Sequence, residues 1–365
     1  MEHPENDDQY KGLKVNKGIA DVPTVNPYIK KRAQRKVYTP SEFVEGILKG
    51  NITILSQAVT LVESSKHEHQ QVAQEIIEKC LPFAGKSVRI GITGVPGAGK
   101  STSIDSFGVH LINQGRKLAV LAIDPSSERS KGSILGDKTR MEALSREKNA
   151  FIRPSPSAGS LGGVARKTRE TIVLCEAAGF DTVFVETVGV GQSETAVHSM
   201  VDFFLLIQLA GTGDELQGIK RGIMEMADGI IINKADGDNI DKANLAAAQF
   251  RNALHLFPPS ESGWFPKVLT YSGYYNIGIK EIWDMVGEYM EFTKKNGYFN
   301  YKRNEQAKYW MYESINDTLR DKFYHNPAVE GMLEQTEKQV LNNEISSFVA
   351  AKRMIDLFLD HIATK

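Results

Sequence analysis

The sequence predicts an α/β fold in which a mostly parallel sheet is covered by helices on both faces. Between residues 86 and 293, short segments rich in β-branched residues alternate with segments whose apolar residues recur at helical spacing. Parallel strands buried on both faces are expected to be almost continuously apolar, as several of these segments are. Beyond about residue 294 the strand pattern stops, and the chain is charged and helical in character.

The expected elements follow one another in a regular order. Strands are predicted at residues 88–93, 118–124, 182–186, 203–209, 229–233 and 268–270. Helices are predicted between them, the clearest at residues 101–114 and 168–179. Helical crossovers of this kind connect parallel strands.

The rest of the chain is arranged around this domain. Thr39-Pro40 begins a helical stretch, and a further helix is predicted at 72–81, after an exposed linker that carries His67 and His69. The predicted organisation is a polar extension, an N-terminal helical segment, the α/β domain and a C-terminal helical arm, at residues 1–38, 39–85, 86–293 and 294–365.

Composition excludes several classes of protein. The 365 residues are 41% hydrophobic and 24% charged, with a net charge of −1, so nothing favours nucleic acid or an anionic membrane as a partner. No apolar run approaches the roughly 20 residues of a membrane span. The polar, acidic N-terminus is unlike a targeting peptide, which predicts a cytoplasmic protein. Cys80 and Cys175 lack metal-site spacing and are expected to be buried thiols.

A glycine-rich segment after the first strand predicts a phosphate site. Residues 94–101 fit the P-loop pattern GxxxxGK[ST] between a predicted strand and a predicted helix. The loop's N–H groups would face phosphate oxygens, Lys100 would reach the β- and γ-phosphates, and the Ser101 hydroxyl would contact Mg²⁺. The candidate binding residues are Gly94, Val95, Pro96, Gly97, Ala98, Gly99, Lys100, Ser101 and Thr102.

Three acidic residues are candidates for holding Mg²⁺ together with Ser101. Asp124 ends a hydrophobic strand, and Asp137 lies in a glycine-punctuated loop that would close over the γ-phosphate. Glu186 begins the segment ETVG, which is similar to the DxxG switch of GTPases with Glu in place of Asp. Gly189 would then offer its N–H to the γ-phosphate.

A second motif identifies the base. Asn233-Lys234-Ala235-Asp236 follows a strand and fits NKxD. The Asp236 carboxylate can accept both the N1–H and the N2 amine of guanine, which adenine cannot supply, so the site would select GTP and GDP. Lys234 would lie along the ring and Asn233 would tie this loop to the phosphate loop. Ser272 and Gly273, after the next strand, would supply a backbone N–H to guanine O6.

Together these motifs resemble the MeaB/ArgK-type GTPases, the methylmalonyl-CoA mutase-associated G proteins. The resemblance covers about residues 40 to 290 and is carried by GITGVPGAGKST, LAIDPSS, GSILGDKTRM, RPSPSAGSLGGVA, VETVGVGQSE, GTGDELQGIKRGI and NKAD. It implies a GTP-hydrolysing chaperone that gates cofactor loading into an adenosylcobalamin-dependent methylmalonyl-CoA mutase, or a related acyl-CoA mutase, and protects it. It also implies a homodimer joined by C-terminal helices.

The resemblance also implies roles for single residues. Asp137 would be the switch I metal contact and Glu186 would belong to switch II. Residues 211–223 match a charged loop that relays the nucleotide state to the mutase, with Asp214, Glu215 and Lys220 as its polar residues.

The predicted reaction is in-line attack of water on the γ-phosphoryl group of GTP. The candidate catalytic residues are Lys100, Asp137, Glu186, Gly189 and Gln192. What positions the water stays open, because Gln192 lies three residues after Gly189 and no arginine is an obvious finger. Slow hydrolysis, accelerated by the partner, is therefore expected. A P-loop small-molecule kinase or transport-associated ATPase and a non-catalytic GTP-gated scaffold remain alternatives.

Overall fold

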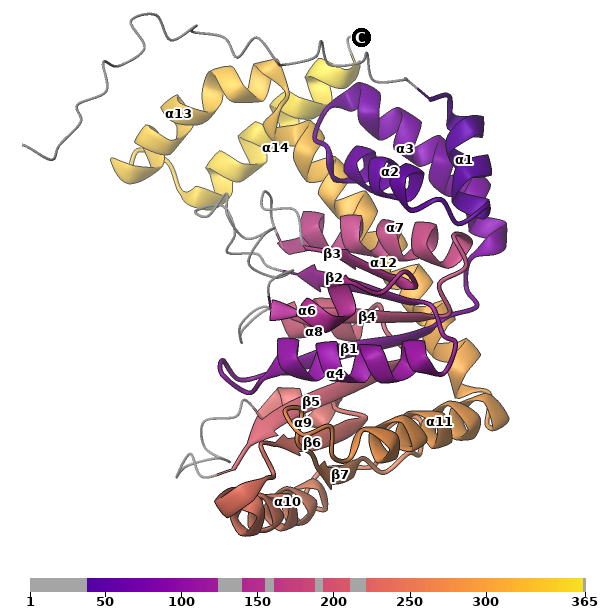
Figure 1. The fold of residues 1–365 in the computed structure, drawn as a ribbon. Coiled ribbons are helices and arrows are strands. Elements are labelled where there is room, and N and C mark those ends of the chain that lie inside the picture. Colours follow the sequence, from indigo (N-terminus) through magenta and orange to yellow (C-terminus); the bar gives the residue numbers. More distant parts are fainter. Residues whose placement is uncertain (1–37, 124–139, 155–160, 188–192, 211–220, 364–365) are drawn as a thin grey trace, which may run out of the picture. The chain divides into compact units, whose positions relative to one another are not determined.

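The computed structural model describes residues 38–123, 140–154, 161–187, 193–210 and 221–363. The described residues from Pro40 onward belong to one unit. A central sheet carries helices on both of its faces (Figure 1). None of the helices in this described part has the length and hydropathy of a membrane span.

Seven parallel strands of the described chain form the sheet, in the spatial order β3-β2-β4-β1-β5-β6-β7. Strands β2, β4 and β6 are buried along their whole length, because helices cover both faces. The predicted α/β fold is therefore confirmed, and its sheet is parallel throughout. The strand bounds are β1 Val88–Gly94, β2 Leu118–Ile123, β3 Ala150–Arg153, β4 Thr182–Thr187, β5 Phe203–Leu209, β6 Gly229–Asn233 and β7 Lys267–Thr270.

The edge strand β3 is an element that the sequence pattern did not predict. It has four residues, of which Phe151 alone is buried, and among the described strands it pairs only with β2. A short edge strand lacks the continuous apolar run by which the six other strands are recognised. Those six begin and end within one residue of their predicted positions.

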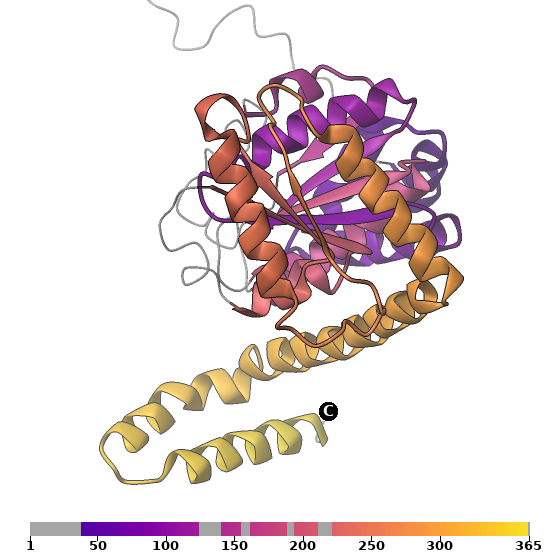
Figure 2. The ribbon, with the colours of Figure 1, turned by 90° about the horizontal axis from the view of Figure 1, so that it is seen from below.

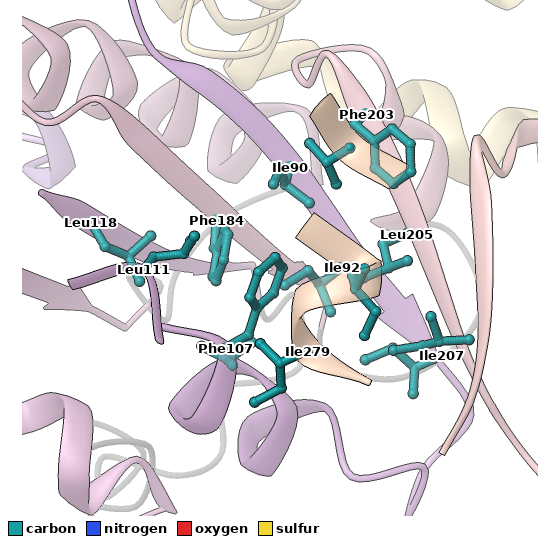
Figure 3. Close-up of a cluster of buried hydrophobic side chains, with 14 of the residues drawn as sticks. Ile90, Ile92, Phe107, Leu111, Leu118, Phe184, Phe203, Leu205, Ile207 and Ile279 are labelled. Carbon is teal, nitrogen blue, oxygen red and sulfur yellow. The ribbon is translucent and has the colours of Figure 1, made fainter. Parts of the chain in front are cut away.

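One face of the sheet packs against α4 (Lys100–Asn113) and α11 (Ile279–Lys295). Figure 3 shows this core, in which Ile90 and Ile92 of β1 lie beside Phe107 of α4. Successive side chains of a strand point to opposite faces, so the residue between these two isoleucines faces the other layer. The core therefore spans the strand on which the phosphate loop begins.

The opposite face carries α7 (Leu161–Ala177) and α8 (Ser193–His198). Gly91 makes the close approach of α8 possible, since a Cβ there would lie 2.8 Å from a Val197 methyl and 2.7 Å from the Phe204 ring. Helix α8 thus sits directly on β1.

Two helix boundaries differ from the predictions. Helix α7 begins at Leu161 instead of the predicted Thr168. The prediction missed its beginning because the first turn contains two glycines, which have low intrinsic helix propensity. Helix α3 begins at His67 instead of Val72, so the prediction of a linker around His67 and His69 is wrong. The first turn of α3 is polar because it faces solvent. The remaining described helices near the sheet are α6 Glu142–Ser145, α9 Arg221–Met226, α10 Ile240–Leu254 and the 3-10 turns Leu81–Phe83 and Gly237–Asn239.

The N-terminal helices pack on α7 and on one another. Helix α1 (Pro40–Leu48) ends before Gly50, whose φ of 72° stops the helical path. Helix α2 (Ile52–Glu63) begins after Asn51, whose side chain accepts from the N–H groups of Thr53 and Ile54 at 3.0 and 3.2 Å. The single helical stretch expected here is therefore a helical pair followed by α3 (His67–Cys80).

The C-terminal residues form α12 (Tyr298–Tyr324), α13 (Pro327–Leu341) and α14 (Ser347–Ala363). Figure 2 shows α12 leading from α11 into α13, with α14 turning back beside α13. A groove of about 860 Å³ with mostly apolar walls lies between these three helices. The expected helical character of this segment is confirmed.

The first half of α12 is anchored at the amino ends of β1 and β5. The Arg303 guanidinium makes two hydrogen bonds of 2.8 Å to the Asp202 carboxylate and donates to the carbonyl of Ser87 at 2.7 Å. Further along, Gln306 donates to Val201 O at 2.8 Å. The beginning of α12 is thus fixed at the amino ends of the central strands, whereas the phosphate loop lies at their carboxyl ends.

Candidate functional site

The phosphate loop joins the carboxyl end of β1 to the first turn of α4. Gly94 lies against β5, and a Cβ there would stand 2.2 Å from the carbonyl oxygen of Ile207. Gly99 has a φ of 85°, and a Cβ there would stand 2.6 Å from Nδ2 of Asn233. Both positions require glycine because backbone or buried amide groups occupy the space. The N-terminal N–H groups of α4 are thereby brought to the sheet edge, where an anion would bind.

Lys100 and Ser101 lie together with Glu186. The Lys100 ammonium donates to Gly94 O at 2.8 Å. Burial holds the pKa of Lys100 below its ordinary value, against the opposing charges of Glu186 and Glu194. The Ser101 hydroxyl donates to Oε1 of Glu186 at 3.3 Å.

Glu186 reaches this position because β4 pairs with β1 in parallel register, placing it opposite Ile92 near the strand ends. One strand position further, the Thr187 hydroxyl donates to that of Thr93 at 2.9 Å. The Ser101 hydroxyl and the buried Glu186 carboxylate lie side by side and offer the oxygen ligands that Mg²⁺ prefers. The residues present therefore fit a magnesium ion.

Asn233 connects the phosphate loop with the two base loops. Its Nδ2 donates to Ala98 O at 2.8 Å, and its Oδ1 accepts from the N–H groups of Lys234 at 2.8 Å and Gly273 at 3.1 Å. The predicted tie between the NKxD and phosphate loops is present. It also extends to the Ser272-Gly273 segment, so the N–H of Gly273 is already donated to Asn233.

Asp236 is held by Ser272. The Ser272 hydroxyl donates to Oδ2 of Asp236, and Ser272 is fully buried. The neighbouring loop is closed by a hydrogen bond of 2.9 Å from the N–H of Ala235 to the carbonyl of Tyr271. Lys234 has a φ of 60°, a rare conformation for a residue with a side chain, which turns the chain between Asn233 and Asp236. The exposed Lys234 stem is free to lie along a base.

Other predicted residues lie outside the described part of the chain. These are Asp124, Asp137, Gly189, Gln192 and the loop residues Asp214, Glu215 and Lys220. Their proximity to the site stays a prediction.

Sequence reasoning missed Glu194 as a site residue. It lies in the first turn of α8, is 2% exposed, and its charge acts on Lys100. It ends the stretch VETVGVGQSE, but the stretch implied no role for it, because its position near Lys100 depends on how α8 packs across Gly91 of β1.

Comparisons with known proteins agree with this geometry. The family model described as methylmalonyl Co-A mutase-associated GTPase MeaB matches residues 55–328. The GTPase ArgK of Escherichia coli (strain K12) is 44% identical over 308 residues, which are 84% of this chain and 93% of that protein. The mitochondrial methylmalonic aciduria type A homolog of Mus musculus is 45% identical over 323 residues, 86% of this chain and 78% of that protein.

A solved structure supports the fold independently. The crystal structure of a LAO/AO transport system kinase has a TM-score of 0.70 and 37% sequence identity, and it covers 88% of this chain and 97% of its own. The phosphate loop, the guanine-type base motif and these relatives lead to one assignment. The chain belongs to the MeaB family of methylmalonyl Co-A mutase-associated GTPases, and it binds guanine nucleotides and hydrolyses GTP.

Proposed function

We propose that this GTPase is a chaperone and gatekeeper for an adenosylcobalamin-dependent methylmalonyl-CoA mutase or a related acyl-CoA mutase. It would admit the cofactor in one nucleotide state and protect the mutase from inactivation. The observation that carries the proposal is the family match over residues 55–328, whose description names the mutase. The name of the mouse relative points to the same metabolism.

The nucleotide would be held at three points. The Lys100 ammonium would exchange Gly94 O for the β- and γ-phosphate oxygens, while the loop from Gly94 to Thr102 surrounds the phosphates with N–H groups. The Asp236 carboxylate would accept guanine N1–H and N2. Since the N–H of Gly273 is donated to Asn233, the O6 contact from Ser272 and Gly273 requires either a shared N–H or a small shift of this loop.

Mg²⁺ would be held by Ser101 and Glu186, which are already in contact, with Asp124 and Asp137 as further ligands. The bound ion would neutralise charge on the phosphate oxygens. The residues of the chain contribute orientation: Glu186 fixes the Ser101 hydroxyl, and Lys100 stabilises charge on the departing β-phosphate.

Hydrolysis would proceed by in-line attack of water. A bond forms between the water oxygen and the γ-phosphorus as the bond to the β–γ bridging oxygen breaks, releasing GDP and phosphate. Asp137 and the N–H of Gly189 would sense the γ-phosphate, and Gln192 is one candidate for orienting the water. Because no residue is firmly assigned to that task, we expect slow turnover without the mutase.

The C-terminal arm would join two copies of this chain. Its groove is bordered by apolar side chains that remain open to solvent, such as Leu319 and Leu359 at 55% exposed and Leu341 at 80%. Phe348, at the start of α14, is 86% exposed. A self-association surface would cover these side chains. Light scattering should therefore detect a dimer that Leu341→Asp and Phe348→Asp weaken, whereas a monomeric wild-type chain would contradict the arm's assignment.

The proposal is tested with purified methylmalonyl-CoA mutase from the same source. We expect the mutase to accelerate GTP hydrolysis and to co-migrate with the GTPase differently in GDP and in a non-hydrolysable GTP analogue. A Lys100→Ala chain, which should lose tight GTP binding, is the control. If neither turnover nor co-migration responds to the mutase, the chaperone role is refuted and the GTPase assignment is untouched.

A further inference from the structure

A pocket of about 430 Å³ lies beside the base loops, and its lining includes Tyr274, a residue to which no role has been assigned above. We call it the base-side pocket. One wall is the outer face of α4, from Thr102 to Val109, and the other is the segment after β7 that contains Gly273 and Tyr274. Thr102 directly follows the phosphate motif and Gly273 belongs to the base loop, so the pocket lies beside the candidate nucleotide site.

The backbone that carries Tyr274 is firmly held. Ser272 and Ile277 exchange two hydrogen bonds, of 3.0 and 3.1 Å, across the base of the loop. Inside it, the N–H of Tyr275 donates to the Ser272 hydroxyl at 3.3 Å and that of Gly273 to Asn233 at 3.1 Å. The Tyr274 side chain is nevertheless 78% exposed. An aromatic ring is thus presented to solvent from a fixed point.

The width of the base-side pocket is fixed from below. The hydroxyl groups of Tyr271 and Ser106 share a hydrogen bond of 2.6 Å, which joins the segment after β7 to α4. Gly273 lies directly on the Tyr271 ring, since a Cβ there would stand 3.1 Å from its hydroxyl oxygen. The two walls are therefore preset before a ligand enters.

The guanine edge would come close to this ring. Asp236, the acceptor for guanine N1–H and N2, is held by Ser272, two residues before Tyr274. A base bonded to Asp236 would therefore lie beside the segment that follows Ser272. The exposed stem of Lys234 offers itself to one face, and an exposed phenol ring suits the other.

We propose that Tyr274 stacks on the guanine ring and sets how long the nucleotide stays bound. This inference rests on the proposed assignment of Asp236 as the guanine acceptor. Stacking uses the face of a purine and not its substituents, so Tyr274 contributes affinity while Asp236 contributes the choice of base. Loss of one aromatic stacking partner weakens nucleotide binding by roughly 5- to 100-fold.

The test compares Tyr274→Ala with Tyr274→Phe, which keeps the ring, and with Tyr312→Ala. Tyr312 of α12 is also exposed, at 61%, and does not line the pocket, so it serves as the matched control. Affinity and dissociation rate are measured by fluorescence with N-methylanthraniloyl-GDP, and competition gives the affinities of GDP, IDP and inorganic pyrophosphate. Circular dichroism checks that each variant is folded.

We expect Tyr274→Ala to weaken GDP and IDP by the same factor, about 10-fold, and to leave pyrophosphate unchanged. Tyr274→Phe and Tyr312→Ala should stay within about threefold of wild type. A Tyr274→Ala chain that binds GDP as tightly as wild type, or that loses GDP but not IDP, overturns the inference. If instead Asp236→Asn leaves the preference of GDP over IDP unchanged, the base assignment itself has failed.

Discussion

Replacing Asn233 by alanine tests whether one buried amide holds the nucleotide site together before any nucleotide arrives. Asn233 is 3% exposed at the end of β6. Its side chain makes bonds of 2.8 Å to Ala98 O, 2.8 Å from the N–H of Lys234 and 3.1 Å from the N–H of Gly273. The substitution removes these three bonds and a longer one of 3.5 Å to the Ser103 hydroxyl, and it leaves the backbone groups in place.

The cost follows from where those groups lie. Ala98 is completely buried, and the N–H of Gly273 is in a buried hydrogen bond, so neither gains water easily. Lys234 is exposed and its N–H can be hydrated. Two unsatisfied buried groups, at roughly 1–3 kcal/mol each, predict a loss of about 2–6 kcal/mol in the free energy of unfolding. Nucleotide affinity should fall too, because the three loops are no longer aligned.

Urea unfolding of the nucleotide-free protein measures the first effect, and fluorescent GDP measures the second. Asn239→Ala is the matched control, since Asn239 donates an exposed bond of 2.7 Å to Lys234 O in the same loop. It should change the free energy of unfolding by no more than about 0.5 kcal/mol. Equal effects of the two substitutions would refute the reasoning, because burial would then not decide the cost.

Four further substitutions probe the scaffold. Gly91→Ala should destabilise the protein by about 1–3 kcal/mol, because the added methyl group overpacks against α8. Gly287→Ala should stabilise it by about 0.5–1 kcal/mol, because Gly287 lies on the exposed face of α11 with no atom within 4 Å of an added Cβ. A lower melting temperature for Gly287→Ala than for Gly91→Ala would contradict this packing argument. Burial disfavours the charged form of Glu176, but hydrogen bonds from the Arg89 guanidinium, the Ser87 hydroxyl and the Gly85 N–H outweigh it and lower the pKa of Glu176 below 4.5. The stability that this carboxylate contributes is therefore present above pH 4.5 and is lost as the pH falls through the lower pKa of the folded state. Glu176→Gln should cost about 3–5 kcal/mol at pH 7 and flatten that acid dependence in urea titrations. Burial, together with the charge of Lys302, lowers the pKa of His198 from 6.5 to about 3. Between pH 7 and pH 5 only the unfolded chain takes up a proton at this residue, so the free energy of unfolding should decline over that range. A His198→Gln variant whose stability declines equally steeply with falling pH would argue against a neutral histidine in the folded protein.

The parts of the fold that the sequence predicted are those with a local signature. Buried parallel strands such as β5 and β6 are continuously apolar, and their bounds agree with the prediction. Strand β3 escaped because an edge strand with one buried side chain has no such run. The predicted α7 was too short because Gly162 and Gly163 in its first turn have low helix propensity, and packing against other elements stabilises this turn in the fold.

The same distinction applies to the site. Residues 94–101 and 233–236 are contiguous motifs whose chemistry can be read directly, and the structure brings them together through Asn233. Tyr274 belongs to no quoted stretch, and Glu194 ends the stretch VETVGVGQSE without a role being implied for it there. Their positions result from the packing of α8 on β1 and from the closed loop after β7, so only the three-dimensional arrangement draws attention to them.

The anchoring of α12 has a mechanical consequence. The helix has 27 residues, and at 1.5 Å per residue it is a stiff rod about 40 Å long. Hydrogen bonds from Arg303, Gln306 and Trp310 fix its first half to the sheet side of the molecule, while α13 and α14 are carried at the other end. The 14 residues beyond Trp310 span about 21 Å, so a rotation of about 5° of the fixed half would move the far end by about 2 Å. Helix α12 thus connects the amino ends of β1 and β5 mechanically to the C-terminal arm.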